Sequence, residues 1–341
     1  MTDDGRTIYG FIEGGASHSF GTIGIDGTEV YTLPLDNISA LISCHSKTGF
    51  DDLPKETLLR NLTVYQSVIE QVMVKHPVIP VKFGTLLDRD EVVIRIMERG
   101  RDQILGCLKD MEDKIELDVV ALWPDLKDVL KEIAISDEIK ALKEKAADQS
   151  EKDVLEMQIQ AGKQVKNLLD RKRESVKSVI MPPLLGMAEK HCVHALMDDS
   201  MIMNAAFLIK KENAARLEGV VAGLDRHYED RINFRIIGPL PPYSFRTFEV
   251  KTADYAQLDN ARKLLGLEEE TTQQEIRDHY WQLSKKFHPD KFPGDPDVQK
   301  HFEKINHAYK LVTDYCRDDS CSFREKDIRG WVSVTVVGNS N

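Results

Sequence analysis

The sequence gathers a tight group of basic side chains in one short stretch. Residues 284–295 read SKKFHPDKFPGD, so three lysines surround the run His288-Pro289-Asp290. The whole chain has a net charge of −11, which makes this basic group a local exception. A local basic patch adds orientation and association rate to a contact more than it adds affinity. The stretch is therefore typical of a transient encounter with a partner.

Other groups of reactive residues give weaker signals. The run EKHCVH holds Glu189, His191, Cys192 and His194, but no two of them have the i, i+4 spacing of metal ligands on a helix, and no second ligand pair follows. The glycines between residues 14 and 27 do not form a phosphate-binding pattern. No serine or cysteine belongs to a hydrolase motif. The sequence predicts no catalytic residue, metal or cofactor.

Three helices are expected to position the stretch 284–295. Gly266 can end the first helix, and Thr272 with Glu275 forms a capping box that begins the second. Pro289 should end the second helix and turn the chain, and Asp295 can cap the third. The second and third helices carry matching apolar faces, and should pack as a hairpin with the basic stretch at its tip. These faces contain Ile276, Tyr280, Leu283 and Phe287 on one helix and Val298, Phe302, Ile305, Tyr309 and Val312 on the other.

The segments LLGL, IRDHYWQLSKKFHPDKFPGD and FEKINHAYKLVTD resemble the J-domain of DnaJ-type co-chaperones, over residues 257–318. The resemblance implies docking on a DnaK-type chaperone and stimulation of its ATP hydrolysis. The residues to which it assigns this contact are Arg277, Lys285, Lys286, His288, Pro289, Asp290 and Lys291. The sequence contains neither the Gly/Phe-rich linker nor the zinc module of large DnaJ proteins, so client choice must come from elsewhere in the chain.

The preceding part of the chain alternates strand-like and helix-like patterns. In residues 1–124, TIYGFIEGG, NISALISCH, HPVIPVKFGTLL and IELDVVALWP are typical of strands, and residues 57–74 of an amphipathic helix. We expect an α+β domain with helices covering one face of its sheet. Residues 125–183 predict a charged helical arm, in which a second helix starts at Ser150 and Pro182-Pro183 ends it.

Two smaller units complete the expected organisation. Residues 184–250 place a helix between the strands MIMNAAFLI and INFRIIG, which suggests a ferredoxin-like α+β domain. The tail, residues 319–341, contains the alternating stretch WVSVTVV. We predict that this strand docks on an unpaired sheet edge, of this chain or of a partner.

The stretches VIPVKFGTLL and MNAAFLIKKE, with FRIIGPLPPYSF further on, resemble the gas vesicle protein F/L family. The match runs from about residue 7 to 248, with Leu240 standing where the family usually has tryptophan. The resemblance implies a non-catalytic gas vesicle component that binds the small, apolar shell subunit and other gas vesicle proteins. Its signature residues, structural or shell-binding, are Pro80, Phe83, Gly84, Thr85, Gly238, Pro239, Pro241, Pro242, Tyr243 and Phe245.

Composition limits the remaining possibilities. The acidic balance argues against nucleic acid as a partner, and the lack of a long apolar run argues against a membrane. The five cysteines form no recognisable framework, so we expect reduced thiols in a cytoplasmic protein. The resemblance to the gas vesicle family implies in addition an association with gas vesicles. The sequence thus predicts a gas vesicle assembly protein that recruits a chaperone. A general J-domain co-chaperone with unrelated clients and a structural vesicle component with an inactive J-domain are the alternatives.

Overall fold

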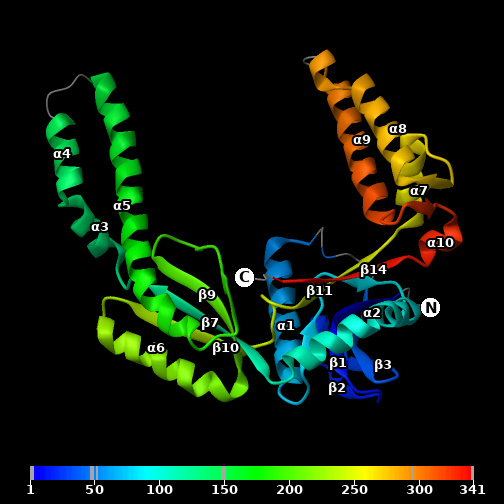
Figure 1. The fold of residues 1–341 in the computed structure, drawn as a ribbon, viewed down its shortest axis with the longest axis horizontal. Coiled ribbons are helices and arrows are strands. Elements are labelled where there is room, and N and C mark those ends of the chain that lie inside the picture. The colour runs from blue at the N-terminus through cyan, green and yellow to red at the C-terminus, as the bar shows by residue number, and fades with distance from the viewer. Residues whose placement is uncertain (1–3, 47–49, 51–52, 147–150, 293–294, 339–341) are drawn as a thin grey trace.

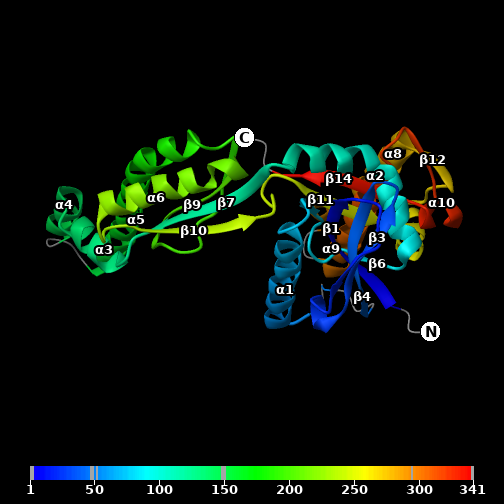
Figure 2. The same cartoon turned by 90° about the horizontal axis from the view of Figure 1, so that it is seen from below.

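The computed structural model describes residues 4–46, 50, 53–146, 151–292 and 295–338. Two α+β units lie side by side, and a helical hairpin stands on each (Figures 1 and 2). The α+β class is therefore confirmed. Within the described residues, no helix combines the length and the apolar composition that a bilayer span needs.

The first unit is built on a six-stranded antiparallel sheet. Its strand order is β2-β3-β4-β1-β5, with β6 paired to the central strand β1. The strands are β1 (Asp4–Glu13), β2 (Ser19–Gly21), β3 (Val30–Leu35), β4 (Ile38–Ser46), β5 (Val78–Pro80) and β6 (Leu86–Leu87). A short 3-10 turn, η1 (Ile25–Gly27), lies between β2 and β3.

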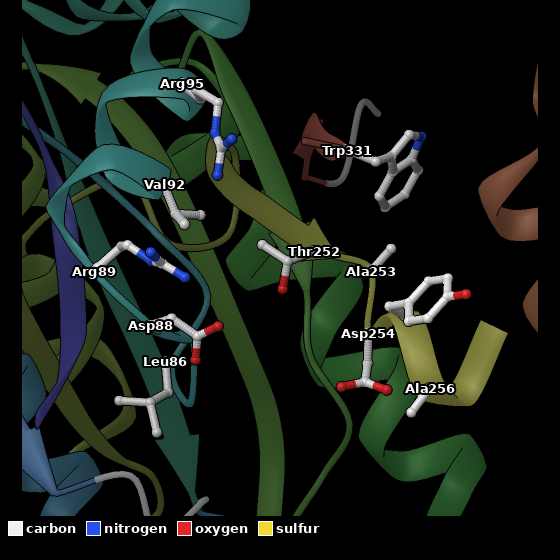
Figure 3. Close-up of a pocket in the computed structure, with 11 residues that line it drawn as sticks. Leu86, Asp88, Arg89, Val92, Arg95, Thr252, Ala253, Asp254, Ala256 and Trp331 are labelled. Atoms are coloured by element: carbon white, nitrogen blue, oxygen red, sulfur yellow. The ribbon is translucent and has the colours of Figure 1, made fainter. Parts of the chain in front are cut away.

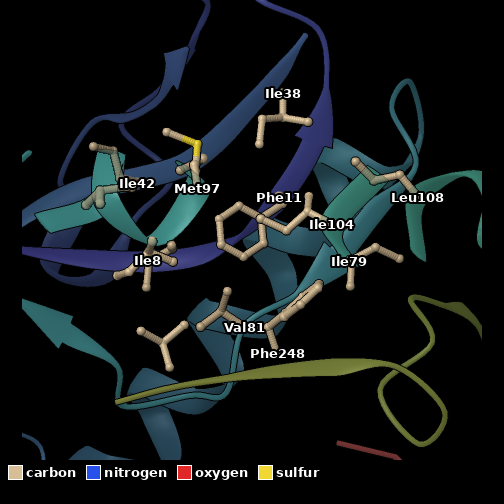
Figure 4. Packing of buried hydrophobic residues seen from close by; sticks show 14 of the residues in the cluster. Ile8, Phe11, Ile38, Ile42, Ile79, Val81, Met97, Ile104, Leu108 and Phe248 are labelled. Atoms are coloured by element: carbon tan, nitrogen blue, oxygen red, sulfur yellow. The ribbon is translucent and has the colours of Figure 1, made fainter. Parts of the chain in front are cut away.

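Helices cover both faces of this sheet, whereas we expected them on one face only. The helices are α1 (Lys55–Met73) and α2 (Asp90–Met111). Ile8 and Phe11 of β1 point into the core beneath α2 (Figure 4), while Tyr9 and Ile12 pack against α1. A register shift between Ile8 and Gly10 places Ile8 and Phe11 on the same face. Because β1 carries apolar side chains on both faces, a helix must pack against each face to bury them.

The second unit is a four-stranded antiparallel sheet with the order β10-β7-β9-β8. Its strands are β7 (Lys114–Leu122), β8 (Lys190–Val193), β9 (Met201–Lys210) and β10 (Asn233–Leu240). Counted along the chain this order is four-one-three-two, which is the ferredoxin-like arrangement. The boundary that we expected at residue 124 is therefore wrong, because β7 pairs with β9 and β10 and is the first strand of this unit.

The charged helical arm is an expansion of the first crossover of the ferredoxin-like unit. It consists of α3 (Leu126–Ala134), α4 (Asp137–Ala146) and α5 (Glu151–Leu185). One face of α5, with Leu169, Ile180 and Leu184, joins the core under the sheet. The helix continues through Pro182 and Pro183 instead of ending there, because the buried Leu184 holds its last turn against the sheet. The expected start at Ser150 lies outside the described residues.

The helix of the second crossover, α6 (Ala214–Tyr228), lies on the same face of the sheet as α5. A 3-10 turn, η2 (Lys211–Asn213), leads into it. Leu217 and Val221 of α6 join the core that contains Ile180 of α5. The two helices and the sheet therefore form two layers around one core.

The C-terminal part, as far as the structure describes it, contains four α-helices, a 3-10 turn and two strand pairs. In chain order its elements are β11 (Thr247–Thr252), α7 (Tyr255–Leu265), β12 (Glu270–Thr272), α8 (Gln273–Lys286), η3 (Pro289–Lys291), α9 (Pro296–Tyr315), β13 (Ser320–Ser322), α10 (Glu325–Arg329) and β14 (Val332–Val337). The predicted tail strand is confirmed, since β14 pairs antiparallel with β11 over six residue pairs. The partner edge belongs to this chain.

The expectation of reduced cysteines is wrong at one pair. Cys316 and Cys321 form a disulfide, with their Cα atoms 5.4 Å apart. Cys316 caps the end of α9 and Cys321 lies on β13, so the turn between these elements brings the two sulfurs together. Cys44, Cys107 and Cys192 keep their thiols.

Candidate functional site

The hairpin of α8 and α9 has a packed and hydrogen-bonded interior. The rings of Tyr280 and Tyr309 stack with their centroids 4.0 Å apart, and the Tyr280 hydroxyl donates to Asn306 Oδ1 at 2.9 Å. Ile276 and Ile305 are buried between the helices. These contacts fix the two helices side by side, and they hold the turn between them at one end of the molecule (Figure 1).

Local signals set the ends of the helices as the sequence indicates. Thr272 and Glu275 form the expected capping box at the start of α8. Gly266 ends α7 with a φ of 70°, a left-handed conformation that favours glycine. Asp295 accepts hydrogen bonds from the backbone N–H groups of Asp297 and Val298 at the start of α9. Each boundary of the hairpin thus has its own side-chain or backbone cap.

The turn at residues 288–290, called the tip below, has a defined geometry. His288 is extended, as expected before a proline, and its Nδ1 accepts a hydrogen bond from the Asp290 backbone N–H at 3.3 Å. The Asp290 carboxylate lies 3.5 Å from the same Nδ1. The imidazole packs edge-on against Phe302 of α9, with ring centroids 5.5 Å apart. The side chains of His288 and Asp290 are therefore accessible to solvent, while contacts within the hairpin fix the conformation of the tip.

Four basic residues form the cationic face of α8 and the tip: Arg277, Lys285, Lys286 and Lys291. All four are exposed, and none has a carboxylate partner within the described residues. The Arg277 guanidinium instead contacts Gln273 and Gln274 of its own helix. Unpaired exposed cations attract an acidic surface without first having to break an internal ion pair.

The structure brings most of the predicted docking residues together. Lys291 Nζ donates to the backbone carbonyl of Lys285 at 2.8 Å, which draws the end of the turn back to the end of α8. Arg277 lies about 12 Å further along the helix axis, two turns before Lys285. Lys285, Lys286 and Lys291 therefore lie close to the tip, while Arg277 lies further along α8.

The two signature stretches of the body, residues 78–87 and 238–245, meet in one cleft. This cleft has a volume of about 490 Å³. Val81, Lys82 and Phe83 line it from the first stretch, and Leu240 and Tyr243 from the second. The stretches belong to different α+β units, so the cleft lies at their junction.

Residues of the first stretch shape one wall of this cleft. Pro80 is buried in β5, opposite Gly10 of β1. Phe83 packs against Tyr65 of α1, with ring centroids 5.2 Å apart. Gly84 has a φ of 88°, and Thr85 donates from its hydroxyl to the Lys82 carbonyl. Phe83 therefore lines the cleft, whereas Pro80 belongs to the strand before it and Gly84 and Thr85 form the turn after it.

The second stretch wraps around β7. Gly238 has a φ of 136°, and an added Cβ would lie 2.7 Å from Leu117 Cδ2 and 2.9 Å from the Glu116 carbonyl. Only glycine fits this position. The peptide bond to Pro239 is cis, and Phe245 is completely buried. Most of the second stretch, including the buried Pro241 and Pro242, is therefore structural.

A partly buried polar network, which was not predicted from the sequence, lines the same cleft. Ser244 donates from its backbone N–H and its hydroxyl to the two carboxylate oxygens of Glu116, at 2.9 and 2.7 Å. His194 Nε2 lies 3.2 Å from the Ser244 hydroxyl. Burial raises the pKa of Glu116 to about 8, and it also raises the pKa of Asp118. The sequence offered one signal for this network, because Glu116 and Asp118 occupy alternate positions of a largely apolar strand.

The residues of the run EKHCVH have separate roles. Glu189 pairs with Lys114 at 3.0 Å, Cys192 is buried in the first core, and His194 belongs to the polar network. Within the described residues, no group of three or more acidic, histidine or cysteine side chains is arranged to hold a metal ion.

Comparison with known proteins identifies the body. The model of the family described as gas vesicle synthesis protein GvpL/GvpF matches residues 5–247. This chain belongs to the GvpL/GvpF family. Gas vesicle protein F of Nostoc sp. is 27% identical over 249 residues, covering 71% of this chain and 97% of that protein. Gas vesicle protein F of a Streptomyces species is 25% identical over 208 residues, covering 60% and 84%.

Solved structures of GvpF share the fold of this body. The crystal structure of GvpF from Anabaena sp. superposes with a TM-score of 0.57 at 24% identity, covering 70% of this chain and 94% of that one. GvpF from Microcystis aeruginosa gives a TM-score of 0.55 at 20% identity, covering 70% and 98%. The part of this chain that follows the GvpL/GvpF match is the C-terminal helical unit.

That helical unit is a DnaJ domain. The DnaJ domain model matches residues 261–317. Chaperone protein DnaJ of Caldicellulosiruptor saccharolyticus is 37% identical over 59 residues, covering 17% of this chain and 15% of that protein. The match to this DnaJ protein thus lies in the J-domain, and the chain joins a GvpL/GvpF body to that domain.

Proposed function

We propose that this protein is a gas vesicle accessory factor that binds the shell subunit through its body and recruits a DnaK-type chaperone through its J-domain. The observation that carries this proposal is the tip. His288 and Asp290 are exposed and Pro289 is half-buried, beside four cations that have no carboxylate partner in the described part of the chain. This geometry suits docking on an acidic surface.

In this proposal, joining the J-domain to the gas vesicle body brings the chaperone to the shell subunit. A small and very apolar shell subunit exposes surfaces that aggregate before assembly. A body that binds this subunit and also recruits a chaperone raises the effective concentration of the chaperone at its client. The protein itself performs no catalysis in this scheme, and the ATP is hydrolysed by the partner.

The signature residues divide into two roles. Gly238 and Phe245 maintain the fold, because the φ of 136° at Gly238 favours glycine and the Phe245 side chain is completely buried. Phe83 and Tyr243 are half-buried and line the cleft, so we assign contact with the shell subunit to these two aromatic side chains. Aromatic side chains in partly desolvated clefts supply much of the affinity of protein interfaces.

The test is steady-state ATP hydrolysis by the DnaK-type chaperone of the same host, with and without the shell subunit. We expect the full-length protein to stimulate hydrolysis, and the shell subunit to increase the stimulation. His288→Gln should abolish both effects. His307→Gln is the matched control, because His307 is exposed on α9 away from the tip.

Each other outcome points to a different function. Stimulation that ignores the shell subunit would favour a general co-chaperone with other clients. No stimulation by the wild-type protein would make the J-domain a structural part of the vesicle component. Equal loss of activity in the two histidine variants would contradict the role assigned to the tip.

A further inference from the structure

Two very short connectors join the J-domain to the body. Only Ala253 and Asp254 separate the end of β11 from the start of α7. Only Gly330 and Trp331 separate the end of α10 from the start of β14. The J-domain is therefore inserted between the two strands of an antiparallel ribbon, β11 and β14 (Figure 1).

The connectors are themselves part of the J-domain. Ala253 and Trp331 both pack against its hydrophobic core, and the Trp331 ring lies 5.5 Å from that of Tyr315. Asp254 caps α7, since its carboxylate accepts from the Gln257 backbone N–H at 2.7 Å. These contacts leave little free chain that could act as a flexible linker.

The ribbon is equally well fixed to the body. Phe248 and Val250 of β11 and Val332 of β14 are buried in the core of the first unit. The backbone N–H of Lys82 donates to the Phe248 carbonyl at 2.8 Å, which joins β11 to the segment after β5. Arg99 of α2 donates to the Val332 carbonyl at 3.0 Å.

The contact between ribbon and α2 is close. A Cβ atom added to Gly100 of α2 would lie 3.1 Å from Val334 Cγ1. Glycine at this position therefore lets β14 approach the helix more closely than any other residue would. Such close packing resists sliding of the ribbon across the helix.

Two clefts lie beside the ribbon, between the J-domain and the body. A cleft of about 380 Å³ lies between α2 and the start of α7. Figure 3 shows Arg89 and Arg95 on one side of this cleft and Thr252 and Asp254 on the other. A second cleft of about 460 Å³ lies between residues 82–87 and the J-domain. The ribbon therefore carries more of the attachment than side-by-side packing does.

We propose that the β11–β14 ribbon is a rigid mount, which holds the J-domain in one orientation with its tip directed away from the body. The rigidity of this attachment does not depend on the proposed function. Only its use in delivering the shell subunit to the chaperone rests on that function. A flexible linker would let the recruited chaperone search a volume around the body. A rigid mount instead presents the chaperone to one place on the body.

The first test is nuclear magnetic resonance relaxation of the backbone amides of the full-length protein. We expect amides of the J-domain and of the two sheets to report the same overall rotational correlation time. A clearly shorter correlation time for α7, α8 and α9 than for the sheets would overturn the proposal, because it would show independent tumbling of the J-domain.

A loosened variant gives the matched comparison. It carries a Gly-Ser-Gly-Ser insertion after Ala253 and a second one after Gly330, and both insertions leave the tip and the ribbon strands unchanged. We expect the correlation time of its J-domain to fall below that of its body. If wild-type and loosened proteins gave the same shortened value for the J-domain, the ribbon would not be a mount.

The same pair of proteins separates this inference from the proposed function. In the ATP hydrolysis assay, the loosened variant should stimulate the chaperone like wild type without shell subunit, but should lose the increase that the shell subunit causes. A loosened variant that keeps the full increase would overturn the use of the mount in delivery. If no protein stimulates hydrolysis, the proposed function fails, while the relaxation data still decide whether the mount exists.

Discussion

Trp331 and Val332 are adjacent in the chain but pack into different hydrophobic cores. The Trp331 ring packs on the core of the J-domain, and the Val332 side chain is 4% exposed in the core beneath α2. Two neighbouring residues thus connect two folded units without any intervening linker. The stability of the body should consequently depend on a strand that follows the J-domain in the sequence.

The first prediction concerns this strand. Val332→Ala should lower the free energy of unfolding of the body by about 1–3 kcal/mol, because it removes buried methyl groups and leaves a cavity. The measurement is the urea midpoint of the full-length protein. Val336→Ala in the same strand is the control, because Val336 is 36% exposed, and it should change stability by less than about 0.5 kcal/mol. Equal effects of the two substitutions would contradict the packing of β14 described above.

The second prediction concerns the cationic face. Lys285→Glu combined with Lys286→Glu should slow association with the DnaK-type chaperone by on the order of tenfold at low salt, because it reverses the local potential. Stopped-flow association kinetics at several salt concentrations measure this effect, which should shrink as salt screens the charges.

A variant with the same change in net charge provides the control. Lys300 and Lys304 are exposed on α9, outside the cationic face. Lys300→Glu combined with Lys304→Glu should leave the association rate nearly unchanged. If both double variants slowed association to the same extent, net charge would explain the result and the placement of the cations would not matter.

The third prediction concerns the disulfide between Cys316 and Cys321. Cys321→Ser should lower the stability of the J-domain by about 2 kcal/mol, since the bond closes a short loop between α9 and β13. The difference from wild type should disappear in a reducing agent, where neither protein has the bond. Thermal unfolding with and without the reductant measures both states. Cys44→Ser should behave like wild type in each, and a disulfide that adds no stability would contradict the prediction.

The helical hairpin could be predicted from the sequence because local signals mark each of its boundaries. Gly266 ends α7, the Thr272–Glu275 box begins α8, and Asp295 begins α9. Such caps act within a few residues, so they can be recognised without knowledge of the rest of the fold. The continuation of α5 through Pro182 was missed because tertiary packing holds its last turn.

Long-range pairing could not be predicted in the same way. The strand character of β7 was clear, but its alternation does not reveal which strands pair with it. The contact between Glu116 and Ser244 joins residues 128 positions apart. The disulfide was missed for a related reason, because cysteine spacing alone does not determine connectivity. The candidate cleft therefore became visible only once the two α+β units were placed together.

The last prediction uses the carboxyl group of Glu116. Its pKa is raised to about 8 in the folded protein, chiefly by burial, whereas a glutamate in an unfolded chain has a pKa of about 4.3. Between these values the folded state holds a proton that the unfolded state has lost. The contribution of Glu116 to stability should therefore fall as the pH rises from about 5 to about 8, and it should level off above that range.

Glu116→Gln should remove this part of the pH dependence, because the amide cannot ionise and its oxygen can still accept from the Ser244 backbone N–H. Urea midpoints at pH 5, 7 and 9, values that bracket the raised pKa, provide the measurement. Relative to wild type, the variant should gain stability steadily between the first and the last of these. Glu112→Gln is the control, since Glu112 is exposed and lies just before β7. A Glu116→Gln profile parallel to that of wild type would contradict the raised pKa, and would show that the two Ser244 donors keep Glu116 ionised at neutral pH.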